Sequence, residues 1–421
     1  MTPLPPPWVT GLRCVLCGIQ YPHGDILTCP ACGEEGILDV ESDLESIRSA
    51  LTREPLEGRP PTLERYRDFL PVSPSIAFPP LAAGWTPVVR AERLGRIAGL
   101  RELFLKDDGR NPTASFKDRA SIVGVMKAGE FGYGTIACAS TGNAASSLAG
   151  IAAASGLPCV IFVPEAAPEP KLTQLLIFGA VVFRVRGTYE DAFRLSALSC
   201  RAFGWYSRNS GTNPFLVEGK KTAGLEVAEQ TAGSPPDWVA VPVGDGCTVG
   251  GIGKGLREMA ALGRLRAAPR LLGIQAEGAS PIAHAFGGTG SLIPAVPRTL
   301  ADSIAVGTPR NWRRALHEIR SSGGAMVTVE DGEILEAMRL CARHAGVFAE
   351  PAAAAALAGL LKAVRTGVIS AGESALVMIT GNGLKDIRSA RRAAGTEFTV
   401  DPDLDQVRAL VRDSVRPGAQ T

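Results

Sequence analysis

This sequence lacks an excess of charge of either sign. Its 421 residues include 44 basic and 42 acidic side chains, which leaves a formal net charge of +2. Nucleic acids and membrane surfaces attract proteins through a concentrated positive field, and a balance this even argues against both as the main partner. We therefore expect no nucleic acid and no membrane as partner, but a small molecule.

Long apolar runs and internal repeats are also missing. No segment reaches about 18 uninterrupted apolar residues, the length of a membrane span, and the N-terminus MTPLPPPWVTGL does not resemble a secretion signal. The one biased stretch, PAAAAALAGLLKAV, is typical of a closely packed helix. With 45% apolar residues the chain has material for a large core. We expect a cytoplasmic protein of two domains plus attachments.

Nine cysteines do not make a disulfide framework here, because five of them are scattered singly among apolar residues. The other four form two CxxC pairs, each followed by a glycine that permits a tight turn toward the thiolates. Four sulfur ligands at this spacing suit a tetrahedral structural zinc with no open position. The pattern predicts a zinc-ribbon-like segment over residues 11–40; the alternative is a metal-free loop. The predicted ligands are Cys14, Cys17, Cys29 and Cys32.

The rest of the chain alternates short β-rich runs with helical periods. TIACA, CVIFVP, VVFRVRG, WVAVPVG, LLGIQAEG and ALVMITG are predicted buried strands, each followed by a turn and a helix. This alternation indicates two open parallel-sheet α/β domains. A helical and proline-rich connector is expected at 41–80 and a catalytic body at 81–400, with a smaller inserted α/β subdomain at about 121–225. A C-terminal tail would follow at 401–421.

Polar residues gather where three of these strands end, which is where ligands bind in parallel sheets. TIACA leads into Ser140, Thr141, Gly142 and Asn143, a turn capping a helix from about Ala144, whose amides and hydroxyls would hold a carboxylate. ALVMI leads into Thr380.

WVAVPVG leads into a glycine-rich turn, Gly244, Asp245, Gly246, Cys247 and Thr248, at the start of another helix. The turn would cradle a phosphate with main-chain amides and the helix dipole. It is not a Walker loop, because GK followed by Ser or Thr is absent. The plain alternative is a tight strand-to-helix connection.

A single lysine, Lys117, stands out in NPTASFKDRA, between Phe116 and Asp118 and just after a proline turn. It could belong to a solvated helix face with Asp118 and Arg119, or it could react with an aldehyde. The stretch alone does not decide between these alternatives.

The motifs together do decide. In chain order NPTASFKDRA, CASTGNAASS, VEGKKTAG, PVGDGCT, EPAAAAALAG and ITGNGLKD resemble the fold type II pyridoxal-phosphate enzymes, the tryptophan synthase β family, over roughly residues 80–395. Within that family they look most like the threonine synthases, pyridoxal-phosphate-dependent lyases of threonine biosynthesis. Those enzymes convert O-phosphohomoserine and water to threonine and phosphate by elimination and replacement.

The resemblance implies a role for each motif. Lys117 would form the Schiff base with pyridoxal 5'-phosphate and carry protons, and the 244–248 turn would bind the cofactor phosphate. Asn143 would lie against the ring hydroxyl and Thr380 would face the pyridine nitrogen. An amino-acid substrate would bind at residues 140–142, and a homodimer is expected.

Two positions depart from the threonine synthase pattern. Leu216 stands where an arginine often precedes EGxKT, and Asn382 stands where TGHGLKD has histidine. Lys220, Lys221, Arg110 or Lys106 would then neutralise the substrate phosphate. A threonine or serine ammonia-lyase, or a β-replacement enzyme acting on phosphoserine or acetylserine, stays open as an alternative. So does a non-catalytic regulator that keeps the fold.

Overall fold

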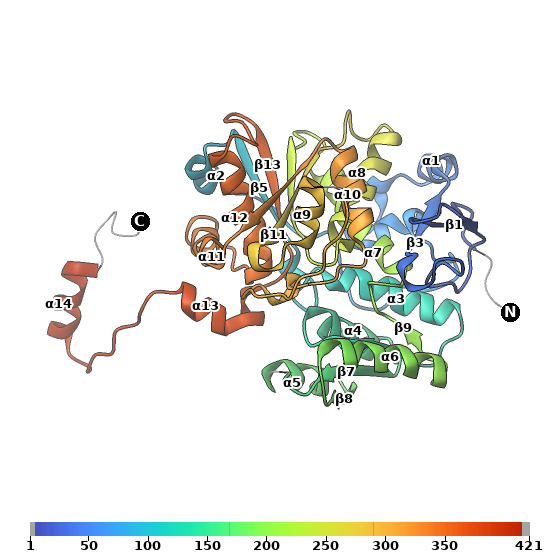
Figure 1. The fold of residues 1–421 in the computed structure, drawn as a ribbon. Coiled ribbons are helices and arrows are strands. Elements are labelled where there is room, and N and C mark those ends of the chain that lie inside the picture. The colour runs from blue at the N-terminus through green and yellow to red at the C-terminus, as the bar shows by residue number, and fades with distance from the viewer. Residues whose placement is uncertain (1–4, 168, 289, 415–421) are drawn as a thin grey trace.

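Three sheets organise this computed structural model, which describes residues 5–167, 169–288 and 290–414. Figure 1 shows the N-terminal segment at one side of two stacked α/β layers, with the last helix set apart on an extended segment. None of the helices in these described ranges combines the length and hydropathy that a bilayer span requires. Residues 415–421 of the predicted tail lie outside the described residues.

The first sheet belongs to the N-terminal segment and is antiparallel in the order β2-β1-β3. Its strands are β1 (Val9–Cys14), β2 (Gln20–Tyr21) and β3 (Leu38–Ser42). The helix α1 (Leu44–Arg53) follows, with the Asp43 carboxylate accepting from the amides of Glu45 and Ser46, as an N-cap does. In the connector, Arg65 and Tyr66 both bond the Glu229 carboxylate, which fastens this segment to the body.

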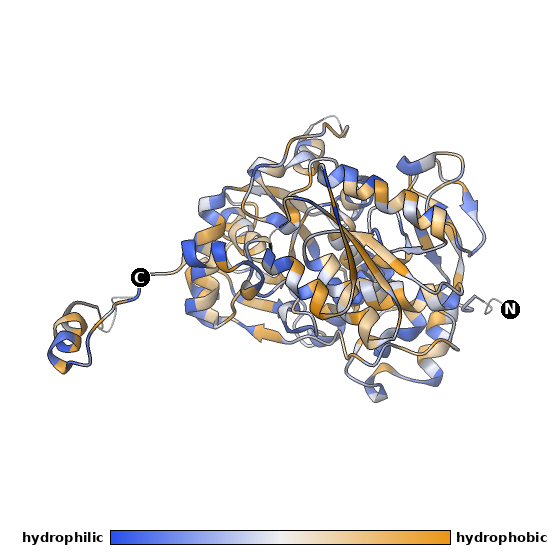
Figure 2. Ribbon diagram, turned by 90° about the horizontal axis from the view of Figure 1, so that it is seen from below, coloured by the Kyte–Doolittle hydropathy of each residue, from blue (hydrophilic) through white to orange (hydrophobic). Residues whose placement is uncertain are grey.

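The largest sheet has the order β12-β11-β10-β13-β5-β4, and all its pairs are parallel except that of the short edge strand β4. In sequence order its strands are β4 (Val88–Arg90), β5 (Glu102–Asp107), β10 (Trp238–Pro242), β11 (Arg270–Ala276), β12 (Ala325–Val329) and β13 (Ser374–Ile379). Successive side chains of these strands enter two different apolar clusters, because side chains alternate across a sheet. The strands therefore read as continuous apolar runs, and Figure 2 shows them in hydrophobic colours.

Helices cover both faces of this sheet. One face packs against α2 (Glu92–Ala98), α11 (Asp331–Ala345) and the alanine-rich α12 (Pro351–Arg365). The other face packs against α7 (Phe215–Gln230), α8 (Cys247–Ala261), α9 (Pro281–Gly287) and α10 (Trp312–Ser321). Two further helices, α13 (Ile387–Ala393) and α14 (Leu404–Ser414), follow the last strand.

The third sheet forms between β5 and β10 of the chain and is parallel, in the order β8-β7-β6-β9. Its strands are β6 (Ile136–Ala139), β7 (Cys159–Pro164), β8 (Val181–Val185) and β9 (Tyr206–Ser207). Its helices are α3 (Lys117–Glu130), α4 (Asn143–Ala154), α5 (Glu169–Ile177) and α6 (Tyr189–Phe203). One expectation is corrected: β8 is not buried, because it is an edge strand on which Val181 and Phe183 are exposed.

Candidate active site

Lys117 is the first residue of α3 and lies beside the end of β13. The Phe116 amide donates to the Thr380 carbonyl at 2.8 Å, and the Asn382 amide donates to the Ala114 carbonyl at 3.1 Å. Ala114 has a φ of 63°, a left-handed conformation that a non-glycine residue adopts only where its surroundings hold it. The tertiary structure thus fixes this turn and, with it, the position of the lysine.

The two residues after Lys117 are not a solvated helix face, so that alternative is wrong. The Asp118 carboxylate is fully buried and accepts from the Thr113 amide at 2.7 Å. The Arg119 guanidinium is also fully buried and bonds Asp108 at 2.6 Å and Glu226 at 2.8 Å. Both neighbours serve the core, whereas Lys117 forms no ion pair among the described residues.

The Lys117 side chain is half-buried, and its pKa is lowered to about 8. The largest cause is burial, which disfavours the ammonium form, and the next is the positive charge of Lys220. An amine with this pKa is partly neutral near neutral pH. It therefore has the free electron pair that a nucleophile or a base needs.

The turn at 244–248 leads from β10 into α8 and presents its amides without acceptors. Gly246 has a φ of 99°, and a Cβ there would lie 2.6 Å from the Asn311 carbonyl oxygen, so only glycine fits. Among the described residues none accepts from the main-chain amides of residues 244–248. The Asp245 carboxylate is held by the Arg310 amide at 2.7 Å and by Asn311 Nδ2 at 2.8 Å. Free amides at a helix N-terminus suit a phosphate, so the fit of the cofactor phosphate is good.

A second set of free amides lies at the start of α4. The Gly142 amide donates to Ser140 Oγ at 3.2 Å, but within the described part of the chain the amides of Thr141, Asn143 and Ala144 have no acceptor. Thr141 and Gly142 also line a cavity. This end of α4 therefore suits a carboxylate.

Asn143 is held by a residue that the sequence analysis did not assign to the site. Its Nδ2 donates to both oxygens of the Glu350 carboxylate at 2.9 Å and to Ser303 Oγ at 3.3 Å. Glu350 precedes the proline that begins α12, and burial raises the pKa of its carboxyl. A Cβ at Gly381 would collide with this carboxylate, so the glycine makes room for it. The sequence offered one sign of this role: a charged residue, Glu350, stands directly before an alanine-rich helix that is otherwise apolar at its start.

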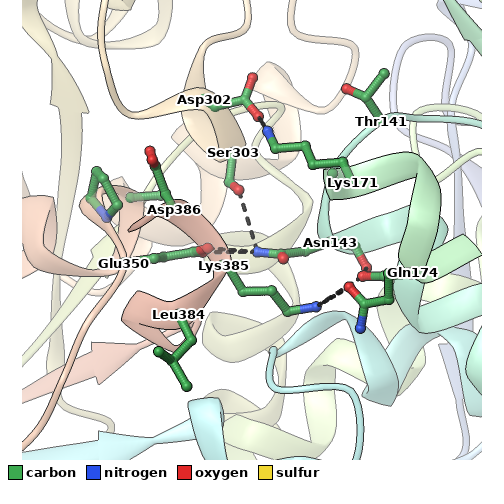
Figure 3. A pocket seen from close by; sticks show the side chains of 14 residues that line it. Thr141, Asn143, Lys171, Gln174, Asp302, Ser303, Glu350, Leu384, Lys385 and Asp386 are labelled. Carbon is green, nitrogen blue, oxygen red and sulfur yellow. Dashed lines mark hydrogen bonds and ion pairs between the residues drawn. The ribbon is translucent and has the colours of Figure 1, made fainter. Parts of the chain in front are cut away.

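Figure 3 shows Asn143 and Glu350 pointing into the cavity between the layers. Lys385 extends from the same side as Glu350, and its Nζ donates to Ser146 Oγ at 3.1 Å and Gln174 Oε1 at 3.2 Å. Lys171 forms an ion pair with Asp302 at the mouth. The cavity is thus polar and opens beside the free amides of α4.

Thr380 and Asn382 follow β13. The Thr380 side chain is half-buried, and none of the described residues bonds its hydroxyl, which leaves it free for a ligand. The Asn382 side chain instead accepts from the Leu384 amide at 3.0 Å. Asn382 therefore caps a local turn and offers no replacement for the histidine that the resemblance led us to expect.

The four candidate cations for the substrate phosphate lie in different environments. Lys106 is fully buried in an ion pair with Glu226 at 2.7 Å, so it is not available to a substrate. Lys221 is fully buried in ion pairs with Glu218 at 2.6 Å and Glu258 at 3.0 Å, so the expectation that it binds substrate is corrected. Arg110 is exposed on the turn before Lys117. Lys220 is buried, forms no ion pair within the described ranges, and influences the pKa of Lys117. Of these candidates, Lys220 alone is buried beside Lys117 without a carboxylate partner among the described residues.

The four N-terminal cysteines converge as predicted from their spacing. Their sulfur atoms all lie within 4.8 Å of one another. The Cys14 and Cys32 sulfurs are 4.0 Å apart and those of Cys17 and Cys29 are 3.7 Å apart. A zinc–sulfur distance of about 2.3 Å in a tetrahedron gives an edge of about 3.8 Å, so the set fits a four-coordinate metal.

The glycines after the two pairs, Gly18 and Gly33, have φ values of 76° and 65° and make the expected turns. The His23 side chain is largely buried, and its ring packs against Phe131 and Phe215. Lys254 donates to the Val40 carbonyl and bonds Glu218, which joins the ribbon to α7 and α8.

The fold and these cofactor-like contacts define a pyridoxal-phosphate enzyme, and comparison with known proteins agrees. The chain belongs to the family described as pyridoxal-phosphate dependent enzymes, whose model matches residues 80–381. A protein named threonine synthase from Methanocaldococcus jannaschii is 38% identical over 404 residues, covering 95% of this chain and 99% of the relative. One of the same name from Methanosarcina acetivorans is 39% identical over 95% of this chain and 98% of the relative.

Solved structures support the fold. A processed threonine deaminase isoform 2 from Solanum lycopersicum has a TM-score of 0.64 at 20% identity, covering 73% of this chain and 87% of that one. A maize serine racemase has a TM-score of 0.64 at 22% identity, and the match covers 81% of this chain and 93% of that one. At these identities the similarity shows the shared architecture alone.

Proposed function

We propose that this chain is a threonine synthase, which converts O-phosphohomoserine and water to L-threonine and phosphate. The observation that carries the proposal is a lysine of lowered pKa at the start of α3, beside Thr380 and without an ion-pair partner in the described ranges, in a fold that also leaves free amides at the N-termini of α4 and α8. Sequence identity of 38–39% over 95% of the chain to proteins named threonine synthase favours this activity over the ammonia-lyase alternative.

The residues present fit pyridoxal 5'-phosphate. The free amides of residues 244–248 would hold its phosphate, Lys117 its aldehyde carbon, and Asn143 with Glu350 its ring hydroxyl. When bound, the cofactor supplies an electron sink next to the amino-bearing carbon of the substrate. Thr380 would place a neutral hydroxyl at the pyridine nitrogen, where a carboxylate would hold a proton. A neutral partner tempers the sink and favours elimination and replacement.

Lys117 would move the protons. Its Nζ has a pKa of about 8, so about half of the amine is neutral at pH 8 and could accept the proton from the substrate Cα. The same amine would have to pass this proton on before it takes one from Cβ. The amides of Thr141, Asn143 and Ala144 would hold the substrate carboxylate at the N-terminus of α4. Binding the carboxylate there would orient the substrate so that its Cα–H bond points toward Lys117 Nζ.

The Cys14, Cys17, Cys29 and Cys32 cluster would bind one structural zinc. Four sulfur ligands leave no position for substrate, so the metal would stabilise the ribbon and its contacts with α7 and α8 rather than take part in turnover. The expectations of a homodimer and of a cytoplasmic location stay predictions.

The activity test uses four separate substrates: O-phosphohomoserine, threonine, serine and phosphoserine. Free phosphate, threonine and 2-oxo acids are measured in each. We expect threonine and phosphate in equal amounts from O-phosphohomoserine, and much slower deamination of threonine. Production of 2-oxobutyrate from threonine without turnover of O-phosphohomoserine would reject the synthase in favour of an ammonia-lyase.

A further inference from the structure

Two buried cations beside Lys117 have no anionic partner among the residues that the structure describes. Arg208 and Lys220 are each 1% exposed. The Arg208 guanidinium donates only to neutral oxygens: Ser121 Oγ at 3.1 Å, Ser210 Oγ at 3.1 Å and the Lys117 carbonyl at 3.3 Å. Burial lowers the pKa of Arg208, as expected for a cation without a countercharge. Buried charges are normally paired, so a missing anion is indicated.

This lack of a partner is confined to the site. Every other buried lysine or arginine in the described part of the chain has a carboxylate within 4.0 Å. These residues are Arg65, Lys106, Arg119, Lys127, Lys221, Lys254 and Arg314. The fold therefore compensates buried positive charge wherever it serves structure. Arg208 and Lys220 are kept free where a ligand would supply the negative charge.

The two cations lie next to the reacting groups. Arg208 touches the Lys117 main chain, and both cations lower the pKa of the Lys117 amine. The Cys247 sulfur at the start of α8 lies 3.8 Å from the Ser210 carbonyl, which follows Arg208 by two residues. The pair thus borders both the lysine and the proposed cradle of the cofactor phosphate.

Arg208 also occupies the space beside Leu216. A Cβ built on Gly124 of α3 would meet Leu216 Cδ2 at 2.9 Å and Arg208 Cγ at 3.6 Å, so both side chains pack on the same spot. Lys220 lies four residues after Leu216, which is one turn further along the same face of α7. Leu216 carries no positive charge, but Arg208 packs next to it and Lys220 lies one helical turn away.

We propose that Arg208 and Lys220 bind the phosphate group that leaves O-phosphohomoserine, an inference that rests on the proposed function. Two positive charges match a phosphate monoester, and the planar guanidinium forms two parallel hydrogen bonds to its oxygens. When the Cγ–O bond breaks, its electron pair stays on the phosphate oxygen, where these cations stabilise the growing charge. The electron pair of the Cβ–H bond forms the new Cβ–Cγ double bond, and Lys117 Nζ takes the proton.

The same pair would set specificity. A substrate without phosphate, such as threonine or serine, would leave two buried cations uncompensated, and an unpaired buried charge carries a large penalty. Arg208 and Lys220 would therefore discriminate against such substrates while the carboxylate site at α4 accepts them equally.

The test uses holoenzyme carrying Arg208→Gln, Arg208→Lys or Lys220→Gln, with the exposed Arg266→Gln as the charge-matched control. Removing either cation should lower kcat/KM for O-phosphohomoserine on the order of 100-fold and weaken calorimetric binding of inorganic phosphate. Affinity for the cofactor, titrated by its visible absorption, should stay within a few-fold. Arg208→Lys should recover part of the activity, because it keeps the charge but loses the two-pronged geometry.

Three results would overturn the inference or separate it from the proposed function. Loss of cofactor affinity with unchanged substrate KM would assign the cations to the cofactor phosphate instead. If Arg208→Gln and Arg208→Lys both lose thermal stability, and lose activity to the same extent as each other, Arg208 has a structural role. If wild-type protein makes no threonine from O-phosphohomoserine but still binds inorganic phosphate through Arg208, the phosphate site stands and the synthase proposal fails.

Discussion

Replacing Lys117 with methionine should stabilise the cofactor-free protein at pH 7. The pKa of this lysine falls from 10.5 to about 8 on folding, so the fold disfavours its protonated form. At about 1.4 kcal/mol per pKa unit the difference corresponds to at most about 3 kcal/mol. Because the side chain is only half-buried, solvent screens part of this cost. We expect a gain of about 1–2 kcal/mol in the free energy of unfolding.

The pH dependence identifies the cause. Below pH 8 the lysine is protonated in both states and the penalty is complete. Between pH 8 and 10.5 the unfolded chain binds more protons, so wild-type stability rises with pH, and above 10.5 the penalty is gone. The advantage of Lys117→Met should therefore be largest at pH 7 and small by pH 10.

Urea unfolding of cofactor-free protein at pH 7 and pH 10 measures this effect, in buffers without phosphate so that no anion binds the site. Lys362→Met is the control, because it removes a partly exposed ion pair with Glu333 and should cost no more than about 1 kcal/mol. A Lys117→Met protein that is less stable than wild type at pH 7, or equally shifted at both pH values, would refute the reasoning.

Three further outcomes are expected. Purified wild-type protein should be yellow, and Lys117→Ala should lose both its visible absorption and its activity; attachment of the cofactor to another lysine after borohydride reduction would contradict the assignment. The chain should bind about one zinc, retained in Lys117→Ala and lost in the Cys14→Ser, Cys17→Ser double variant, with metal analysis as the readout. Thr380→Asp should strengthen the electron sink, which raises side reactions such as transamination more than it changes cofactor affinity. An unchanged spectrum and product ratio would mean that Thr380 does not face the pyridine nitrogen.

Local sequence patterns were enough to predict most of the two main sheets. The six predicted strands all form, because runs of β-branched and aliphatic residues flanked by glycine fit a parallel sheet buried on both faces. The pattern did not reveal that β8 lies at a sheet edge, since burial depends on which neighbour pairs with the strand. It also missed four strands of these two sheets: the short β4 and β9, which pairing rather than composition makes strands, and the longer β5 and β12 of the largest sheet.

The sequence by itself determined the motifs of the site: the lysine after its turn, the glycine-rich helix starts and the four cysteines are local features. The role of the lysine followed only from the resemblance of the combined motifs to a known family. Only the tertiary structure decided which of the lysines and arginines near the site have a carboxylate partner and which do not. Lys220 and Lys221 are neighbours in the chain, but successive helix residues point about 100° apart, so one meets two carboxylates and the other faces Lys117. Glu350 and Arg208 lie far from Lys117 in sequence. Arg208 follows the end of β9, whereas Glu350 precedes α12 and its amide donates to the Gly381 carbonyl just after β13. These contacts depend on how distant elements pack, and no local pattern records them.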